Sequence, residues 1–140
     1  MPIQSKTEPA KISASEWQIP GRGVLEGKGL NTGITLLRYV TDVVGEGPTL
    51  HVHPYDAIFT ITEGRARFTV GDKTIGAEAG DVVLGPANIP HGYRNLGPGR
   101  LDSLDIHLSP EWIQFNLAGA WDKSSVLLSA ESKVDRDGNP

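Results

Sequence analysis

The sequence contains no cysteine and one methionine, and aromatic residues make up only 6% of its 140 residues. Without cysteine, disulfide bonds and thiolate metal sites are excluded. No run of lysine or arginine occurs and the net charge is −4, which disfavours nucleic acid as a ligand. No apolar stretch approaches the length of a membrane span, and the first residues lack the apolar segment of a secretory signal. We therefore expect a cytoplasmic protein with neither nucleic-acid nor membrane partners.

Glycine and proline, in contrast, are abundant, with 17 and 10 residues respectively. Without low-complexity repeats, this composition indicates many tight turns between short elements, as in a barrel or sandwich. Gly71-Asp72 lies between two apolar runs and predicts a hairpin turn. Runs of apolar and β-branched residues predict strands at 34–40, 50–53, 57–62, 65–70, 73–75, 81–84, 92–95 and 101–108. No βαβ spacing occurs, so we expect an all-β barrel that occupies residues 31–108.

The two ends of the chain differ from this central part. Residues 1–30 are polar and interrupted by proline and glycine, so we expect an N-terminal arm with a short strand near 12–19. Ser109-Pro110-Glu111 combines an N-cap residue, a first-turn proline and an acidic side chain, which predicts a short C-terminal helix at 109–121. Residues 122–140 are expected to form a polar, frayed tail.

Histidine is scarce, but three of its four copies fall in two short segments. His51 and His53 are separated by one residue in a predicted strand, so their side chains project from the same side. His91 follows a second predicted strand. Neutral imidazole is a common ligand of divalent transition metals. His51, His53 and His91 are therefore candidate ligands of one metal ion with open positions for a substrate.

The spacing around these histidines resembles that of the cupin family. The first cupin motif is matched by Gly45, His51, His53 and Gly64, and the second by Gly80, Pro86, His91 and Asn95. This resemblance, which covers residues 34 to 108, implies a double-stranded β-helix, that is, a jelly-roll barrel. It also implies that small proteins of this kind commonly form homodimers, with the N-terminal arm crossing to the second subunit.

Two positions depart from the family pattern. Asn88 replaces a glycine of the second motif, a mild change because asparagine tolerates a left-handed backbone. Ala57 stands where the family usually has a metal-binding glutamate, and the neighbouring Asp56 is expected to point away. Either a metal is held by His51, His53 and His91 alone, or the barrel is a metal-free binder. Because all three histidines are retained, we favour the metal.

A three-histidine site contributes no negative charge, so a divalent ion there favours small oxygen-rich anions such as enolates, catecholates or 2-hydroxy acids. The ligand set resembles that of cupin dioxygenases acting on β-diketones, which implies an iron(II) oxidoreductase. Zinc, nickel or manganese would instead indicate isomerase, lyase or hydrolytic chemistry. The alternative class is a non-catalytic small-molecule-binding cupin, a sensor or accessory subunit. The sequence assigns no catalytic residue.

Further candidates line the expected cavity. His107 either faces the cavity as an acid–base group or replacement ligand, or lies on the outer face of its strand. The apolar residues Leu104, Ile106 and Leu108 form the opposite face of that strand and could be the core, which favours the outer position for His107. The candidate cavity residues are Tyr55, Ala57, Phe59, Tyr93 and His107, with Arg38 as a further one.

Overall fold

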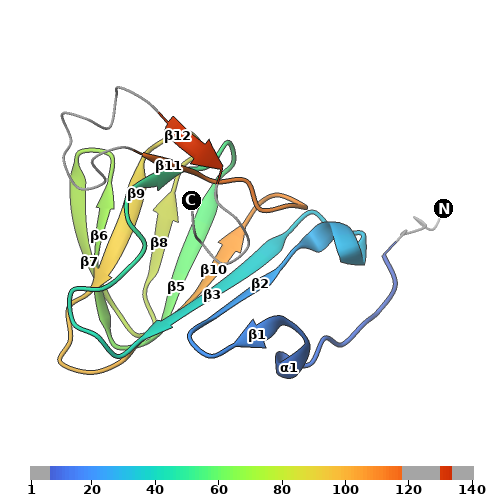
Figure 1. The fold of residues 1–140 in the computed structure, drawn as a ribbon, viewed down its shortest axis with the longest axis horizontal. Coiled ribbons are helices and arrows are strands. Elements are labelled where there is room, and N and C mark those ends of the chain that lie inside the picture. The colour runs from blue at the N-terminus through green and yellow to red at the C-terminus, as the bar shows by residue number, and fades with distance from the viewer. Residues whose placement is uncertain (1–6, 118–129, 134–140) are drawn as a thin grey trace.

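The computed structural model describes residues 7–117 and 130–133, whose strands form two six-stranded antiparallel sheets (Figure 1). Sheet A contains, in spatial order, β1 (Gln18–Ile19), β2 (Arg22–Leu25), β3 (Thr35–Thr41), β10 (Leu101–His107), β5 (Ala57–Glu63) and β8 (Val82–Gly85). Sheet B contains β12 (Ala130–Lys133), β11 (Phe115–Leu117), β4 (His51–Val52), β9 (His91–Asn95), β6 (Arg65–Val70) and β7 (Lys73–Glu78). The expected all-β class is confirmed.

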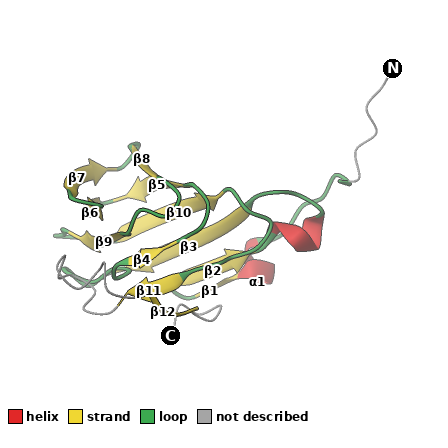
Figure 2. Ribbon diagram, turned by 90° about the horizontal axis from the view of Figure 1, so that it is seen from above, coloured by secondary structure: helices red, strands yellow, loops and turns green. Residues whose placement is uncertain are grey.

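Helical structure in the described residues is confined to short turns near the N-terminus. The helix α1 spans Ala14–Trp17 and the 3-10 helix η1 spans Gly27–Leu30. Both lie at the end of the molecule where β1 and β2 extend sheet A (Figure 2). Within the parts of the chain that the structure describes, no helix is long and apolar enough to cross a membrane.

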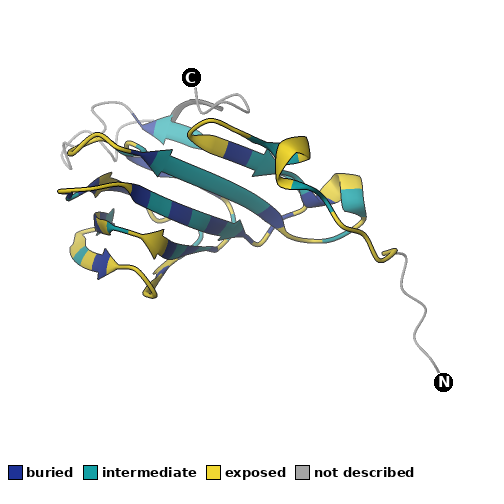
Figure 3. Cartoon of the chain, turned by 90° about the horizontal axis from the view of Figure 1, so that it is seen from below, coloured by how far each residue is buried: buried dark blue, intermediate teal, exposed yellow. Residues whose placement is uncertain are grey.

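The hydrophobic core lies between the sheets because their strands alternate between buried and more exposed residues (Figure 3). Phe59, Phe68 and Tyr93 form its centre, with ring centroids between 4.7 and 5.8 Å apart. The β6–β7 hairpin covers one end of this core and turns at Gly71, whose φ of +60° suits glycine. The aromatic centre borders a cavity, because Phe59 and Tyr93 also form part of its lining.

The predicted C-terminal helix at 109–121 is wrong over residues 109–117, which form an irregular segment and then strand β11. The Ser109 hydroxyl closes a local turn with the backbone of Glu111 instead of capping a helix. The next backbone N–H groups bond to residues distant in sequence. The N–H of Trp112 donates to the Glu26 carboxylate, and the N–H of Ile113 donates to the Tyr55 hydroxyl. These contacts override the local helix signal. Residues 118–121 lie outside the described residues.

The ends of the chain also contribute more to the sheets than the sequence suggests. Residues 18–25 are not a detached arm, because β2 pairs with β3 along four residues and β1 pairs with β2. The strand expected near 12–19 is mostly the helix α1, with β1 at its end. Within the expected polar tail, residues 130–133 pair with β11 as strand β12. Pairing at the edges of both sheets explains these additions, because open strand edges need partners.

Candidate metal centre

Three histidines from sheet B meet at one point inside the barrel. His51 lies on β4 directly opposite His91 on β9, and His53 follows β4. The ring centroid of His91 lies 4.4 Å from that of His51 and 5.0 Å from that of His53. All three side chains are buried. The expected convergence of these residues is therefore present in the structure.

The orientation of each ring is fixed by a backbone carbonyl. Nδ1 of His51 lies 2.6 Å from the oxygen of Thr49, and Nδ1 of His91 lies 3.1 Å from that of Ile89. Nδ1 of His53 lies 2.7 Å from the oxygen of Ile113. Because a carbonyl only accepts, each Nδ1 carries the proton and each Nε2 keeps its lone pair. Second-shell hydrogen bonds of this kind orient the histidine ligands of metals.

Two of the three Nε2 atoms make no hydrogen bond within the part of the chain that the structure describes. Those of His53 and His91 are buried without any hydrogen-bond partner. One nitrogen from each of the three residues lies within 4.8 Å of the others, as a shared metal ligand set requires. A buried acceptor without a partner is costly, so the cluster fits a divalent cation held by three imidazoles.

The electrostatics of the cluster keep the imidazoles neutral. Burial lowers the pKa of His53 to about 2 and that of His91 to about 4. Burial, together with repulsion from His91 and His53, also holds the pKa of His51 well below its usual value. Neutral imidazole is the form that binds metals, so the site is ready for a cation at neutral pH.

Turn geometry between β8 and β9 positions His91. Asn88 has a φ of +64°, so the asparagine in place of the motif glycine adopts the left-handed backbone, as expected. Its N–H donates to the carbonyl of His53, which ties the two halves of the cluster together. A Cβ on Gly85 would lie 2.8 Å from the ring of Phe59, so glycine lets this ring lie beside His91. Asp56 points away, as expected, and accepts from the N–H of Ala87.

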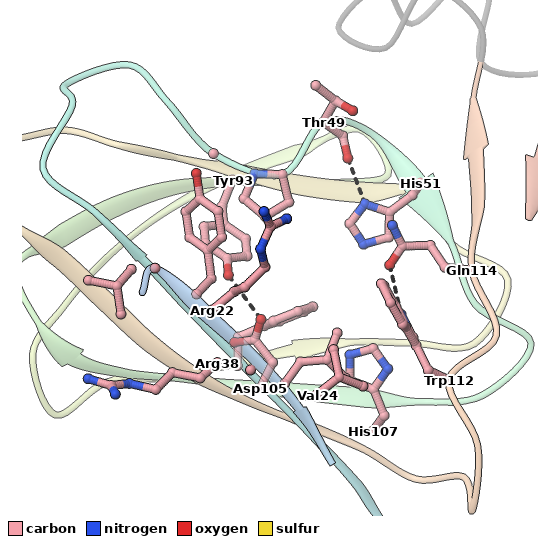
Figure 4. A pocket seen from close by; sticks show the side chains of 18 of the residues that line it. Arg22, Val24, Arg38, Thr49, His51, Tyr93, Asp105, His107, Trp112 and Gln114 are labelled. Atoms are coloured by element: carbon pink, nitrogen blue, oxygen red, sulfur yellow. Dashed lines mark hydrogen bonds between the residues drawn. The ribbon is translucent and has the colours of Figure 1, made fainter. Parts of the chain in front are cut away.

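A cavity of about 470 Å³ opens beside the cluster, and His51 forms part of its wall (Figure 4). Of the candidate cavity residues, Phe59, Tyr93 and His107 line it, whereas Tyr55 and Ala57 do not. Tyr55 instead stacks on His53, with ring centroids 5.1 Å apart. Ala57 is fully buried in the hydrophobic core. Arg38 contributes to the wall, but its guanidinium is paired with Asp102.

The interpretation that His107 lies on the outer face of β10 is wrong. His107 is buried, lines the cavity and lies with its ring centroid 4.4 Å from that of His53. Its Nδ1 is hydrogen-bonded to the Tyr55 hydroxyl at 2.7 Å. Burial lowers the pKa of His107 to about 3, so the ring is neutral. Leu104 and Ile106 lie on the opposite, less buried face of β10, whereas Ser103, Asp105 and His107 lie on the buried face.

Several functional residues escape the sequence analysis. Asp105 lies on the inner face of β10, two residues before His107, and lines the cavity. Arg22 extends toward the cavity beside Tyr93 (Figure 4), from a strand within the expected arm. Trp112 and Gln114 line the wall from the segment expected to be helical. The only sequence signal for Asp105 is its position two residues before His107, which places both side chains on the same face of one strand.

Comparisons with known proteins agree with this architecture. The cupin domain family matches residues 38–107, half of the chain. A comparison with curated protein sequences found no match.

Solved structures resemble the chain in fold. An uncharacterised protein with a double-stranded β-helix domain from Klebsiella pneumoniae has a TM-score of 0.62 at 22% identity, over 81% of this chain and 96% of that one. Oxalate decarboxylase from Bacillus subtilis, described with Mn(II) centres, has a TM-score of 0.62 at 23% identity, over 66% of this chain. The oxalate decarboxylase of Lactobacillus farciminis, in a formate complex, has a TM-score of 0.61 at 20% identity, over 69% of this chain. The match covers 26% and 31% of these two decarboxylase chains.

The two facing sheets, the matched family region and the neighbouring β-helix folds lead to the same assignment. The chain belongs to the cupin domain family, with a double-stranded β-helix and a cluster of three histidines inside it.

Proposed function

We propose that this protein is a metal-dependent enzyme that holds one divalent cation on Nε2 of His51, His53 and His91. The observation that carries this proposal is the shared orientation of the rings. Each Nδ1 is bonded to a carbonyl, while the buried Nε2 atoms of His53 and His91 have no partner. A structural role for the histidines would leave these acceptors unpaired at a cost in stability.

The substrate class follows from charge. Three imidazoles add no negative charge, so a cation bound there would retain its double charge and bind an anionic, chelating ligand as a Lewis acid. Arg22, on the cavity wall, adds a positive charge toward the same space. Phe59 and Val24 give the rest of the wall an apolar part. We therefore propose a small oxygen-rich anion: an enolate, a catecholate or a 2-hydroxy acid.

The chain's own residues would position this anion. Trp112, which is buried and donates its indole N–H to Gln114, holds the amide of Gln114 at the cavity wall. His107 is neutral and fixed by Tyr55, so it offers a ring nitrogen without charge. The buried wall excludes water from one side of the ligand, which strengthens its contacts with these groups.

For the reaction, we favour oxygen-dependent cleavage of a carbon–carbon bond with iron(II), as in a dioxygenase. The test is oxygen uptake by iron-loaded protein with acetylacetone or catechol as substrate. We expect uptake in the wild type and none in the His51→Ala/His91→Ala double variant. A loaded wild-type protein that consumes no oxygen with either substrate would contradict the dioxygenase proposal.

A second candidate reaction is decarboxylation of a small dicarboxylate with manganese(II). It is favoured by the fold shared with oxalate decarboxylases, one of which is described with Mn(II) centres. Carbon dioxide release from oxalate by manganese-loaded protein would support it. If neither reaction occurs in metal-loaded protein, the remaining proposal is a binding cupin without turnover, which retains ligand when metal is removed.

A further inference from the structure

Asp105 occupies a position where a carboxyl group is unexpected. On the inner face of sheet A it lies between Leu37 of β3 and Phe59 of β5. The same row continues to Val24 on β2 and Val83 on β8. Asp105 is therefore the polar member of a row of apolar side chains, and it is only 6% exposed. Burying a carboxyl group among such neighbours costs free energy unless both of its oxygens are hydrogen-bonded.

Its hydrogen bonds satisfy only one of its two oxygens. The hydroxyl of Tyr93 donates to Oδ2 of Asp105 at 2.9 Å. The same hydroxyl lies 2.8 Å from Oγ of Ser103, which donates to it, because the tyrosine has one proton and gives it to the carboxylate. Oδ1 of Asp105 is buried and has no hydrogen-bond partner among the described residues. Asp105 lines the cavity that His51 also lines (Figure 4).

We propose that Asp105 is a catalytic residue whose carboxylate takes a proton from the substrate as it binds, and returns a proton to the product. This inference rests on the proposed function, since the anion would be held at the histidine cluster. In the forward step the substrate's C–H or O–H bond breaks and its electron pair stays on the substrate. The proton forms an O–H bond on the carboxylate, which becomes neutral, and the substrate becomes an anion.

The surroundings of Asp105 suit this role. Burial raises its pKa to about 7, although hydrogen bonds from Tyr93 and Ser103 oppose the change. A general base works best with a pKa near the working pH. Among the described residues, the other titratable groups that line this cavity are Tyr93 on β9, Tyr39 and Arg38 on β3, His107 on β10, His51 on β4, Arg22 on β2 and Glu46 in the loop before β4. Burial raises the pKa of Tyr93 and Tyr39 and lowers that of His107, so these three do not exchange protons near neutrality.

The test counts the protons released when acetylacetone binds to metal-loaded protein. Acetylacetone binds a cation as its enolate and so gives up one proton. Calorimetry in two buffers of different ionisation enthalpy measures the share of that proton that reaches the buffer. At about pH 8 the wild type should release little, because Asp105 is ionised before binding and keeps the proton in the complex, where the negative charge of the bound enolate raises the pKa of this carboxyl. At about pH 6 it should release nearly a full proton, because Asp105 is already protonated.

The variant Asp105→Asn keeps the shape of the side chain and an acceptor for Tyr93, but takes up no proton. We expect it to release a full proton at both pH values with unchanged metal content. Tyr39→Phe is the matched control, since it removes a hydroxyl from the same cavity wall and keeps Asp105 with its contacts, and it should behave as the wild type. If Asp105→Asn does not fold, Asp105→Ser replaces it in the same measurement, because serine also provides an oxygen that can accept from Tyr93.

The outcomes separate this inference from the proposed function. Equal proton release by wild type and Asp105→Asn at about pH 8, in fully loaded protein, overturns the role of Asp105 and leaves the metal centre intact. Failure of acetylacetone to bind a loaded site also overturns it. Absence of metal from the wild type, measured on the same samples, overturns the proposed function and the inference together.

Discussion

The two sheets contribute different chemistry to the same cavity. Sheet B supplies His51 and His91, and His53 follows it, all neutral and all oriented by carbonyl groups. Sheet A supplies His107 and Asp105 from alternate positions of β10. The sheet B wall is a set of fixed lone pairs, whereas the sheet A wall holds a group with a pKa near neutrality. In this account sheet B binds the cation and sheet A moves the proton. A substitution in one sheet can therefore test one role without removing the residues of the other.

The largest expected effect is on metal binding, which should depend on the histidines of sheet B and not on His107 of sheet A. His53→Ala should lose its bound metal, because one of three ligands is removed from a site without a carboxylate. His107→Ala, a change of the same size at the ring packed against His53, should retain the metal. Competition titration with a chromogenic chelator measures both. Equal loss in the two variants would contradict the assignment of the ligand set to sheet B.

The next effect concerns stability and its dependence on pH. Burial raises the pKa of Asp105 from 3.8 to about 7, so the folded state holds its proton more strongly than the unfolded state. The stabilisation is complete below about pH 4 and is lost as the pH rises to about 7, by on the order of 4 kcal/mol. Urea unfolding of metal-free protein over this range should show the loss in the wild type but not in Asp105→Asn. Parallel profiles of the two proteins would show that Asp105 titrates normally.

A smaller effect is expected where the two walls are joined. The Tyr55 hydroxyl accepts from the N–H of Ile113 and is bonded to His107, while the carbonyl of Ile113 holds His53. Tyr55→Phe should therefore cost about 1–3 kcal/mol of stability and weaken metal binding by about 10-fold or more. Tyr39→Phe, which removes only a long contact with Glu46, is the control and should leave metal binding unchanged. Similar losses in both variants would argue against the link through Ile113.

The smallest effect belongs to the mouth of the cavity. Arg22 is exposed, so solvent and salt screen its charge. Arg22→Gln should weaken binding of oxalate to metal-loaded protein by a few-fold at low salt, roughly as expected for an exposed charge. Raising the salt concentration should remove the difference between variant and wild type. An unchanged affinity at low salt would exclude Arg22 from anion binding.

Local spacing was enough to predict the sheet B wall. The alternation rule placed His51 and His53 on one side, and the second motif placed His91 at the end of a neighbouring strand. Asn88 took the backbone conformation expected of a glycine substitute. These features depend on residues that are close in sequence, so the local spacing is enough to predict them.

The sheet A wall could not be predicted in this way. On β10 the apolar residues Leu104 and Ile106 suggested the core, but they face outward and the polar residues face the cavity. Exposed Val82 and Leu84 on β8 show the same outward apolar face, 63% and 55% exposed. Which face of a strand is buried depends on the partner sheet, and a polar cavity reverses the usual pattern. The segment around Trp112 was misjudged because its partners, Glu26 and Tyr55, are distant in sequence.

The central claim is that three Nε2 lone pairs hold one metal ion. Elemental analysis of protein purified without chelator tests it most directly, alongside the His51→Ala/His91→Ala double variant. The account predicts close to one equivalent of divalent metal in the wild type and none in the variant. A wild-type protein that binds no metal, even after reconstitution, or a variant that binds as much as the wild type, would contradict it.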